Sequence, residues 1–167
     1  MGHPVLRARA RPVEPAELKH PLLQKLIDDM IETMHEYHGV GLAAPQIHEP
    51  LRLFVALLVE EPDAKSEAVV VINPEIIPNG PAIEEGWEGC LSIPDIRGKV
   101  PRYTDILVKA LDRTGRPVEL ELKNFSARVA QHETDHLDGV LFFDRMKTFD
   151  TLTFMDEYSR FWSKDED

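Results

Sequence analysis

The chain has 167 residues, 43% of them hydrophobic, and a formal net charge of −11 at pH 7. This length predicts one domain, residues 1–167, with a sizeable core. No apolar run reaches the roughly 18 residues that a membrane span needs, and an acidic chain is unsuited to nonspecific nucleic-acid binding, which depends on neutralising phosphates. The amino-terminal arginines lack a secretory apolar core, and a single cysteine excludes an intrachain disulfide. We therefore expect a cytoplasmic protein.

The first predicted element is an amphipathic helix over residues 22–37. Its apolar residues recur every three or four positions and form one stripe. Pro21 suits the start of a helix and Gly39 suits its end. The following residues, 39–46, contain two glycines and a proline, which is typical of a shaped loop.

Several strands are predicted next. Residues 51–59 and 69–73 are expected to form buried strands on either side of a polar loop, and Pro74 is expected to end the second. The segment 83–94 contains the only cysteine. Residues 106–111 and 118–122 flank a hairpin turn at Asp112–Gly115.

The second predicted helix covers residues 125–137 and contains His132-Glu133-Thr134-Asp135-His136. Two histidines four residues apart lie on one helix face, where they can share a divalent metal while the glutamate acts on a water there. The same pattern occurs on polar helices whose histidines are only solvated. Apolar neighbours favour a buried helix, in which imidazoles need partners.

A short closing helix is predicted over residues 151–162. The order of elements predicts an α+β fold, with mostly antiparallel sheets around a central HExxH helix and an amphipathic helix near the amino terminus.

Cys90 is the candidate for a third metal ligand. A lone cysteine is more often a small buried hydrophobe. Gly89 permits close approach of the backbone, which fits a thiolate presented from an extended edge. The residues alone leave both interpretations open.

Three motifs resemble those of peptide deformylases and occur in the same order. They are Gly39–Gln46, Glu88–Ser92 and Gln131–His136. The resemblance covers nearly the whole chain. It implies a metal-dependent hydrolase that removes the formyl group from the N-terminal formyl-methionine of newly synthesised polypeptides and releases formate.

The resemblance also assigns roles at the site. The implied metal ligands are Cys90, His132 and His136, with a water in the fourth position, as in a catalytic site. Glu133 would take the proton of this water and deliver it to the leaving amine. The side-chain amide of Gln46 and the backbone N–H of Leu91 would stabilise negative charge on the formyl oxygen.

Substrate-binding residues are expected beside these groups. Gly41 resembles a residue whose backbone pairs with an extended substrate. Val40 and Val129 are candidates to line a pocket for the methionine side chain. Arg128 lies one turn before His132, and we expect its methylenes to line the same pocket while its charge stays in water. A purely surface arginine is the alternative.

Glu88 is a candidate supporting residue. It lies two residues before Cys90 and so points to the same side of a strand. We expect its carboxylate to contact a ligand imidazole or to pair with Arg102. A solvated glutamate is the alternative.

A thiolate and two imidazoles suit zinc, but the resemblance implies Fe²⁺ as the native metal, with Zn²⁺, Ni²⁺ or Co²⁺ able to replace it. The expected partners are nascent formyl-Met polypeptides. The acidic segment 150–167 disfavours docking on ribosomal RNA, so any transient ribosome contact is expected not to use a basic tail. Whether the protein is a monomer or a dimer is left open.

Other functions remain as alternatives. An HExxH metallopeptidase generally takes its third ligand from a downstream His or Glu, whereas Cys90 lies upstream. A structural-metal or binding module would have a closed site. An inactive relative is a further alternative, although every motif position is retained.

Overall fold

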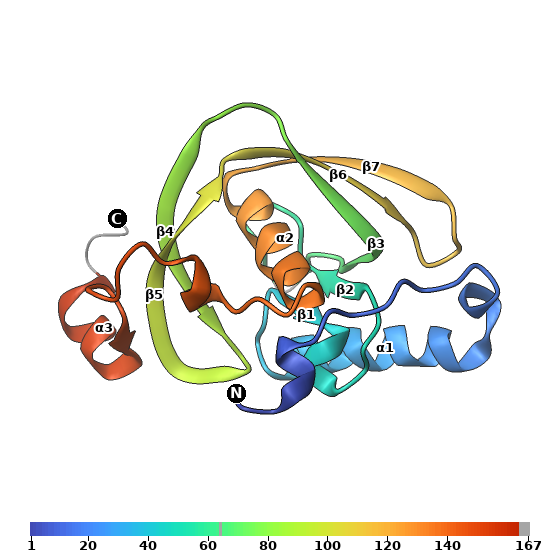
Figure 1. Cartoon of the computed structure of the whole chain (residues 1–167), viewed down its shortest axis with the longest axis horizontal. Coiled ribbons are helices and arrows are strands. Elements are labelled where there is room, and N and C mark those ends of the chain that lie inside the picture. Colours follow the sequence, from blue (N-terminus) through green and yellow to red (C-terminus); the bar gives the residue numbers. More distant parts are fainter. Residues whose placement is uncertain (64, 164–167) are drawn as a thin grey trace.

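The computed structural model describes residues 1–63 and 65–163. The fold is α+β, with two antiparallel sheets (Figure 1). The first sheet has the order β1-β2-β3-β6-β7 and the second the order β4-β5-β8. The strands of the first sheet are β1 (Gly41–Ala43), β2 (Leu53–Ala56), β3 (Val69–Pro78), β6 (Asp105–Leu111) and β7 (Pro117–Lys123). Those of the second are β4 (Ile83–Cys90), β5 (Ile93–Tyr103) and β8 (Thr153–Phe154).

The helix α2 (Asn124–Leu137) lies in the middle of the molecule and contacts both sheets (Figure 1). On the five-stranded sheet it packs beside Phe54 and Val108, and its own Ala127 and Ala130 are fully buried there. Neighbouring residues of a strand point to opposite faces of a sheet, so Leu53 and Val55 of β2 lie on the face away from α2. Because α2 also contacts β5 of the second sheet, it is packed on more than one side.

The helix α1 (Pro21–Glu36) covers the opposite face of the five-stranded sheet. The His20 side chain accepts a hydrogen bond from Leu22 N, and Pro21 occupies the first turn. The apolar stripe buries Ile27, Met30 and Met34 against β2. Each such side chain contributes roughly 1.5–3 kcal/mol when fully buried, so packing fixes this helix more than its intrinsic propensity.

The predicted strand bounds were wrong around Pro74. Strand β3 continues through this proline to Pro78, with a change of register between Ile72 and Glu75. Asn73 adopts a φ of 51°, and its side chain pairs with both Val13 N and Val13 O at 2.9 Å. The irregularity places the proline where no ladder hydrogen bond from its nitrogen is needed. Strand β2 is also shorter than the predicted 51–59.

The segment 39–46 is more regular than the predicted loop. Strand β1 pairs with β2, with Gly41 opposite Ala56, and a 3-10 turn follows at Ala44–Ile47. The segment 83–94 contains the whole of β4 and the first two residues of β5, because these strands form a hairpin around Leu91 and Ser92. Strand β5 was not predicted.

The carboxyl-terminal segment also differs from the prediction. A helix was expected over 151–162, but β8 comes first and α3 covers only Met155–Phe161. Tyr158 of α3 packs edge-on against Trp87, with ring centroids 5.0 Å apart. The predicted domain and acidic tail include residues 64 and 164–167, which lie outside the described part. Within that part, no helix has the length and apolar composition needed to cross a bilayer.

Candidate active site

Three candidate metal ligands converge from two elements. Cys90 ends β4, whereas His132 and His136 lie one turn apart on α2. Their ligand atoms all lie within 4.8 Å of one another, and Cys90 Sγ is 3.3 Å from His136 Nε2. A thiolate and two imidazoles form a donor set suited to zinc and related divalent ions. The residues therefore fit a metal of this class.

Burial supports this role for His136. The side chain is almost fully buried, and burial lowers its pKa to about 3. The imidazole is therefore neutral near pH 7, with a lone pair available for a metal. For His132, burial also lowers the pKa, but hydrogen bonds to Cys90 and Glu88 outweigh it and raise the pKa well above its ordinary value.

Glu133 points into the same region from α2. Burial raises the pKa of its carboxyl to about 7, and the nearby Glu88 charge adds to this. Among the described residues, its Oε2 has no hydrogen-bond partner. A carboxyl with a pKa near neutrality can both take up and return a proton at physiological pH. Its position and its pKa both suit a general base.

Gln46 reaches the site from the 3-10 turn after β1. Its Oε1 accepts a hydrogen bond from Ala43 N at 2.9 Å. This contact fixes the orientation of the amide, so the NH₂ group faces Cys90 Sγ at 3.5 Å and Ser92 Oγ at 3.1 Å. A side-chain donor is thereby held beside the three ligand atoms.

A cleft of about 620 Å³ opens above these groups. It is bounded by the 39–41 segment, the β4–β5 turn and α2. All four predicted substrate-binding residues line it, together with Gln46 and Leu91: Val40, Gly41, Arg128 and Val129. Trp87 and Met155 line it as well, and sequence reasoning missed both. Neither belongs to a recognised motif, and Met155 reaches the cleft only because α3 docks on the second sheet.

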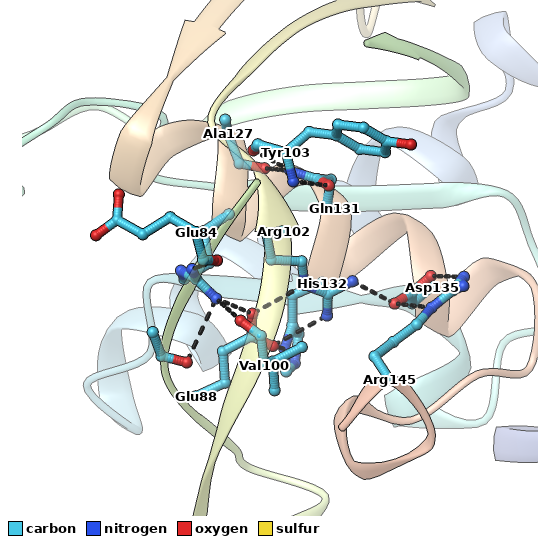
Figure 2. Close-up of polar contacts among 12 residues, drawn as sticks. Glu84, Glu88, Val100, Arg102, Tyr103, Ala127, Gln131, His132, Asp135 and Arg145 are labelled. Atoms are coloured by element: carbon cyan, nitrogen blue, oxygen red, sulfur yellow. Dashed lines mark hydrogen bonds and ion pairs between the residues drawn. The ribbon is translucent and has the colours of Figure 1, made fainter. Parts of the chain in front are cut away.

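Glu88 satisfies both predicted contacts at once (Figure 2). Its Oε2 lies 2.9 Å from His132 Nδ1, and its two oxygens accept hydrogen bonds from Arg102 Nε and Nη2 at 2.9 and 3.0 Å. Burial favours the neutral acid, but the bonds from Arg102 and His132 outweigh it and lower the pKa of Glu88 to about 2. The residue is therefore a buried carboxylate that orients an imidazole.

The network extends further than was predicted. Arg102 Nη1 donates to Asp135 Oδ2 at 2.6 Å, and Arg145 Nη2 donates to Asp135 Oδ1 at 2.7 Å (Figure 2). Asp135 lies three residues after His132, on a helix face that also meets β5. Its place inside the HExxH motif was the only available signal.

The guanidinium of Arg128 does not lie in water, and this part of the prediction was wrong. It donates to Val100 O at 2.7 Å, to Glu84 O at 2.8 Å and to Glu88 Oε1 at 3.0 Å. The side chain is only 14% exposed, so the alternative of a purely surface arginine is wrong as well.

Comparisons with known proteins agree with this geometry. Residues 1–151 match the family model described as polypeptide deformylase. Peptide deformylase 2 of Nostoc sp. is 43% identical over 98% of this chain and 93% of its own length. The crystal structure of peptide deformylase from Thermotoga maritima aligns with a TM-score of 0.80 and 46% identity, over 89% of this chain and 95% of that one.

A class I type b peptide deformylase from Acinetobacter baumannii, crystallised with Met-Ala-Ser bound, aligns with a TM-score of 0.81 and 40% identity, over 87% of this chain and 94% of that one. Both the family model and the relatives cover most of the chain. The chain therefore belongs to the polypeptide deformylase family, the enzymes that remove N-formyl groups from nascent polypeptides.

Proposed function

We propose that this chain deformylates the N-terminal formyl-methionine of new polypeptides with one divalent metal, Fe²⁺ in the cell, held by Cys90, His132 and His136. The convergence of the three ligand atoms beside Glu133 carries the proposal. Zn²⁺, Ni²⁺ or Co²⁺ is expected to occupy the same donor set. When bound, such an ion supplies Lewis acidity and makes water acidic enough to react near neutral pH.

Glu133 handles the proton in this proposal. The attacking water loses a proton as it adds to the formyl carbon, and the amine needs a proton as it leaves. A carboxyl whose pKa lies at about 7 can carry out both transfers. Burial keeps bulk water from competing for the proton.

Gln46 and Leu91 provide for the negative charge that develops on the formyl oxygen. The Gln46 amide is already oriented by Ala43 N, with its donors toward Cys90. The backbone of Leu91 follows Cys90 in the turn that lines the cleft. Donors placed beforehand stabilise such charge without reorganisation.

The cleft fits an extended peptide. Strand β1 is one edge of the five-stranded sheet and β4 is one edge of the three-stranded sheet, and residues of both line the cleft. A peptide strand that enters between two edges can hydrogen-bond through its main chain, with Gly41 as one partner. Val40, Val129 and the stem of Arg128 would surround the methionine. The relative crystallised with Met-Ala-Ser supports a deformylated peptide as product.

The proposal includes a cytoplasmic location and encounters with nascent chains that do not depend on a basic tail. Residues 150–167 hold six acidic side chains against Arg160 and Lys164, which opposes attraction to phosphates.

The test is formate release from formyl-Met-Ala-Ser by protein purified anaerobically with Fe²⁺. We expect turnover by the wild type, and expect Glu133→Ala to retain metal but lose turnover. Casein hydrolysis without formate release would identify a metallopeptidase instead. Bound metal with no turnover on either substrate would indicate a structural site.

A further inference from the structure

Arg128 connects the wall of the cleft to the metal ligands. It lies on α2 one turn before His132 and also lines the cleft. Its Nη1 donates to Glu88 Oε1 at 3.0 Å and to Val100 O at 2.7 Å, while Nη2 donates to Glu84 O at 2.8 Å. One guanidinium therefore joins α2 to both strands of the β4–β5 hairpin.

The contact with Arg128 completes the set of donors around the Glu88 carboxylate, whose contacts with Arg102 and His132 are drawn in Figure 2. Oε1 receives Arg102 Nε and Arg128 Nη1, whereas Oε2 receives Arg102 Nη2 and faces His132 Nδ1. Arg102 also donates a hydrogen bond to Asp135, so its charge is shared between two carboxylates. Arg128 makes no second ion pair among the described residues, since its other acceptors are main-chain carbonyls. Its charge is therefore directed at Glu88.

Gly86 provides the space for this arrangement. A Cβ built on Gly86 would lie 2.9 Å from both Cζ and Nη2 of Arg128. The backbone of Gly86 is not in the left-handed region, and the three heavy atoms nearest to such a Cβ all belong to the guanidinium of Arg128. Gly86 and Arg128 are thus complementary in shape, and a methyl group at position 86 would displace the arginine without removing its charge.

We propose that Arg128 is a positioning residue for the metal centre, acting through Glu88 on the ligand His132. It also holds α2, which supplies two ligands, against β4, which supplies Cys90. Carboxylates that orient ligand histidines typically change metal affinity about 10- to 100-fold when they are lost. A residue that fixes such a carboxylate acts on the same quantity, independently of any contact with substrate.

The inference rests on the metal site proposed above, so its test measures metal binding rather than turnover. The Zn²⁺ dissociation constant is measured by competition with a chromophoric chelator, and the ligand geometry is followed by the visible absorption of the Co²⁺-loaded protein. We expect Arg128→Leu to weaken Zn²⁺ binding about tenfold and to change the Co²⁺ spectrum. Arg128→Lys should restore only part of the affinity, because an ammonium cannot reproduce the planar fork.

Gly86→Ala tests the same contact without altering Arg128. We expect Gly86→Ala to weaken Zn²⁺ binding in the wild-type protein. In protein that already carries Arg128→Leu, it should have no further effect, so that a double-mutant cycle shows coupling between the two positions.

The control is Arg113→Leu. Arg113 also ties two elements together, with bonds to Gln24 Oε1 at 3.0 Å and Asp28 Oδ1 at 2.8 Å, but it does not reach Glu88. We expect it to lower stability and to leave Zn²⁺ affinity unchanged.

Zn²⁺ affinity and a Co²⁺ spectrum equal to the wild type in both Arg128→Leu and Gly86→Ala would overturn this inference and leave the proposed function intact. Failure of the wild type to bind any metal would overturn the proposed site itself. If Arg128→Leu does not fold, Arg128→Lys and Gly86→Ala decide the matter by the same measurements. An equal loss of affinity in Arg113→Leu would assign the effect to general destabilisation and would also overturn the inference.

Discussion

Gly41 of β1 lies directly against the carboxyl group of Glu133. A Cβ built on Gly41 would overlap Glu133 Oε1 and lie 2.7 Å from its Cδ and 2.9 Å from its Cγ. The strand that is proposed to bind the substrate backbone is therefore also the wall that limits where the proposed base can lie.

Gly41→Ala should push the Glu133 carboxylate away from the cleft. Because a general base acts only within hydrogen-bond reach of its proton, we expect kcat for formyl-Met-Ala-Ser to fall about 10²-fold or more. Metal content should stay at the wild-type level, since the three heavy atoms nearest to the new methyl group all belong to Glu133 and none to a ligand. Unchanged kcat would show that Glu133 does not need its observed position.

Gln46→Glu should separate the two functions of this side chain. A carboxylate can still accept the hydrogen bond from Ala43 N, but it offers no donor toward Cys90. We expect a loss of about 10²–10³ in kcat, the usual effect of removing one oxyanion donor. Formate release is measured beside Gln46→Ala, which also removes the bond to Ala43. Wild-type turnover in both variants would contradict the oxyanion role.

Arg128→Ile should change the preference among formyl peptides, because the stem of Arg128 lines the cleft. We expect the ratio of kcat/KM between formyl-Met and formyl-norvaline peptides to shift by about tenfold, since single groups in an apolar pocket are worth roughly 1–3 kcal/mol. Both kcat/KM values are measured on one enzyme preparation. Any effect of the substitution on metal content lowers both values equally and cancels in their ratio. An unaltered ratio would remove Arg128 from the methionine pocket.

Asp144→Asn should lower stability in a pH-dependent way. Although burial raises the pKa of Asp144, hydrogen bonds from Arg7 and from Leu141 N, the latter at 2.8 Å, outweigh it and lower the pKa below its ordinary value. A carboxyl whose pKa is lower in the folded than in the unfolded state stabilises the fold at pH values above its unfolded pKa. This contribution is lost as the pH falls through the folded-state pKa.

We therefore expect a deficit of about 0.5–1 kcal/mol near neutral pH, the scale of an exposed ion pair. It should shrink as the pH falls below about 4. Urea unfolding of metal-free protein across this range measures it, and Arg7→Leu should show the same trend. A deficit that is independent of pH would assign the effect to packing.

The sequence predicted those elements whose signals are local. The stripe of α1 and the turn at Asp112–Gly115 carry their information within a few residues, and both lie where periodicity and turn composition place them. The course of β3 through Pro74 depends on Asn73 pairing with Val13, 60 residues away. The turn between β4 and β5 at Leu91 and Ser92 lacks glycine and asparagine, so these two residues do not match the usual sequence pattern of a hairpin turn.

The candidate site shows the same division. The three motifs pointed to the proposed ligands, base and oxyanion donors because each motif is short and retains its residue types, and all of these residues except the buried His136 line the cleft. The contacts of Arg128 were missed because three of its acceptors are main-chain carbonyls, which have no signature in the sequence. Arg145 could not be foreseen, since its pairing with Asp135 depends on the path of the chain after α2.

The ligands of the proposed metal site come from separate parts of the architecture, with Cys90 and His136 46 residues apart in the chain. A folding intermediate with only α2 formed would offer two imidazoles and no thiolate. Tight metal binding would thus report that helix and hairpin have docked. Metal present at about 100 times its dissociation constant would add roughly 2.7 kcal/mol to the stability of that docked state, and removing it with a chelator should destabilise the assembled molecule as a unit.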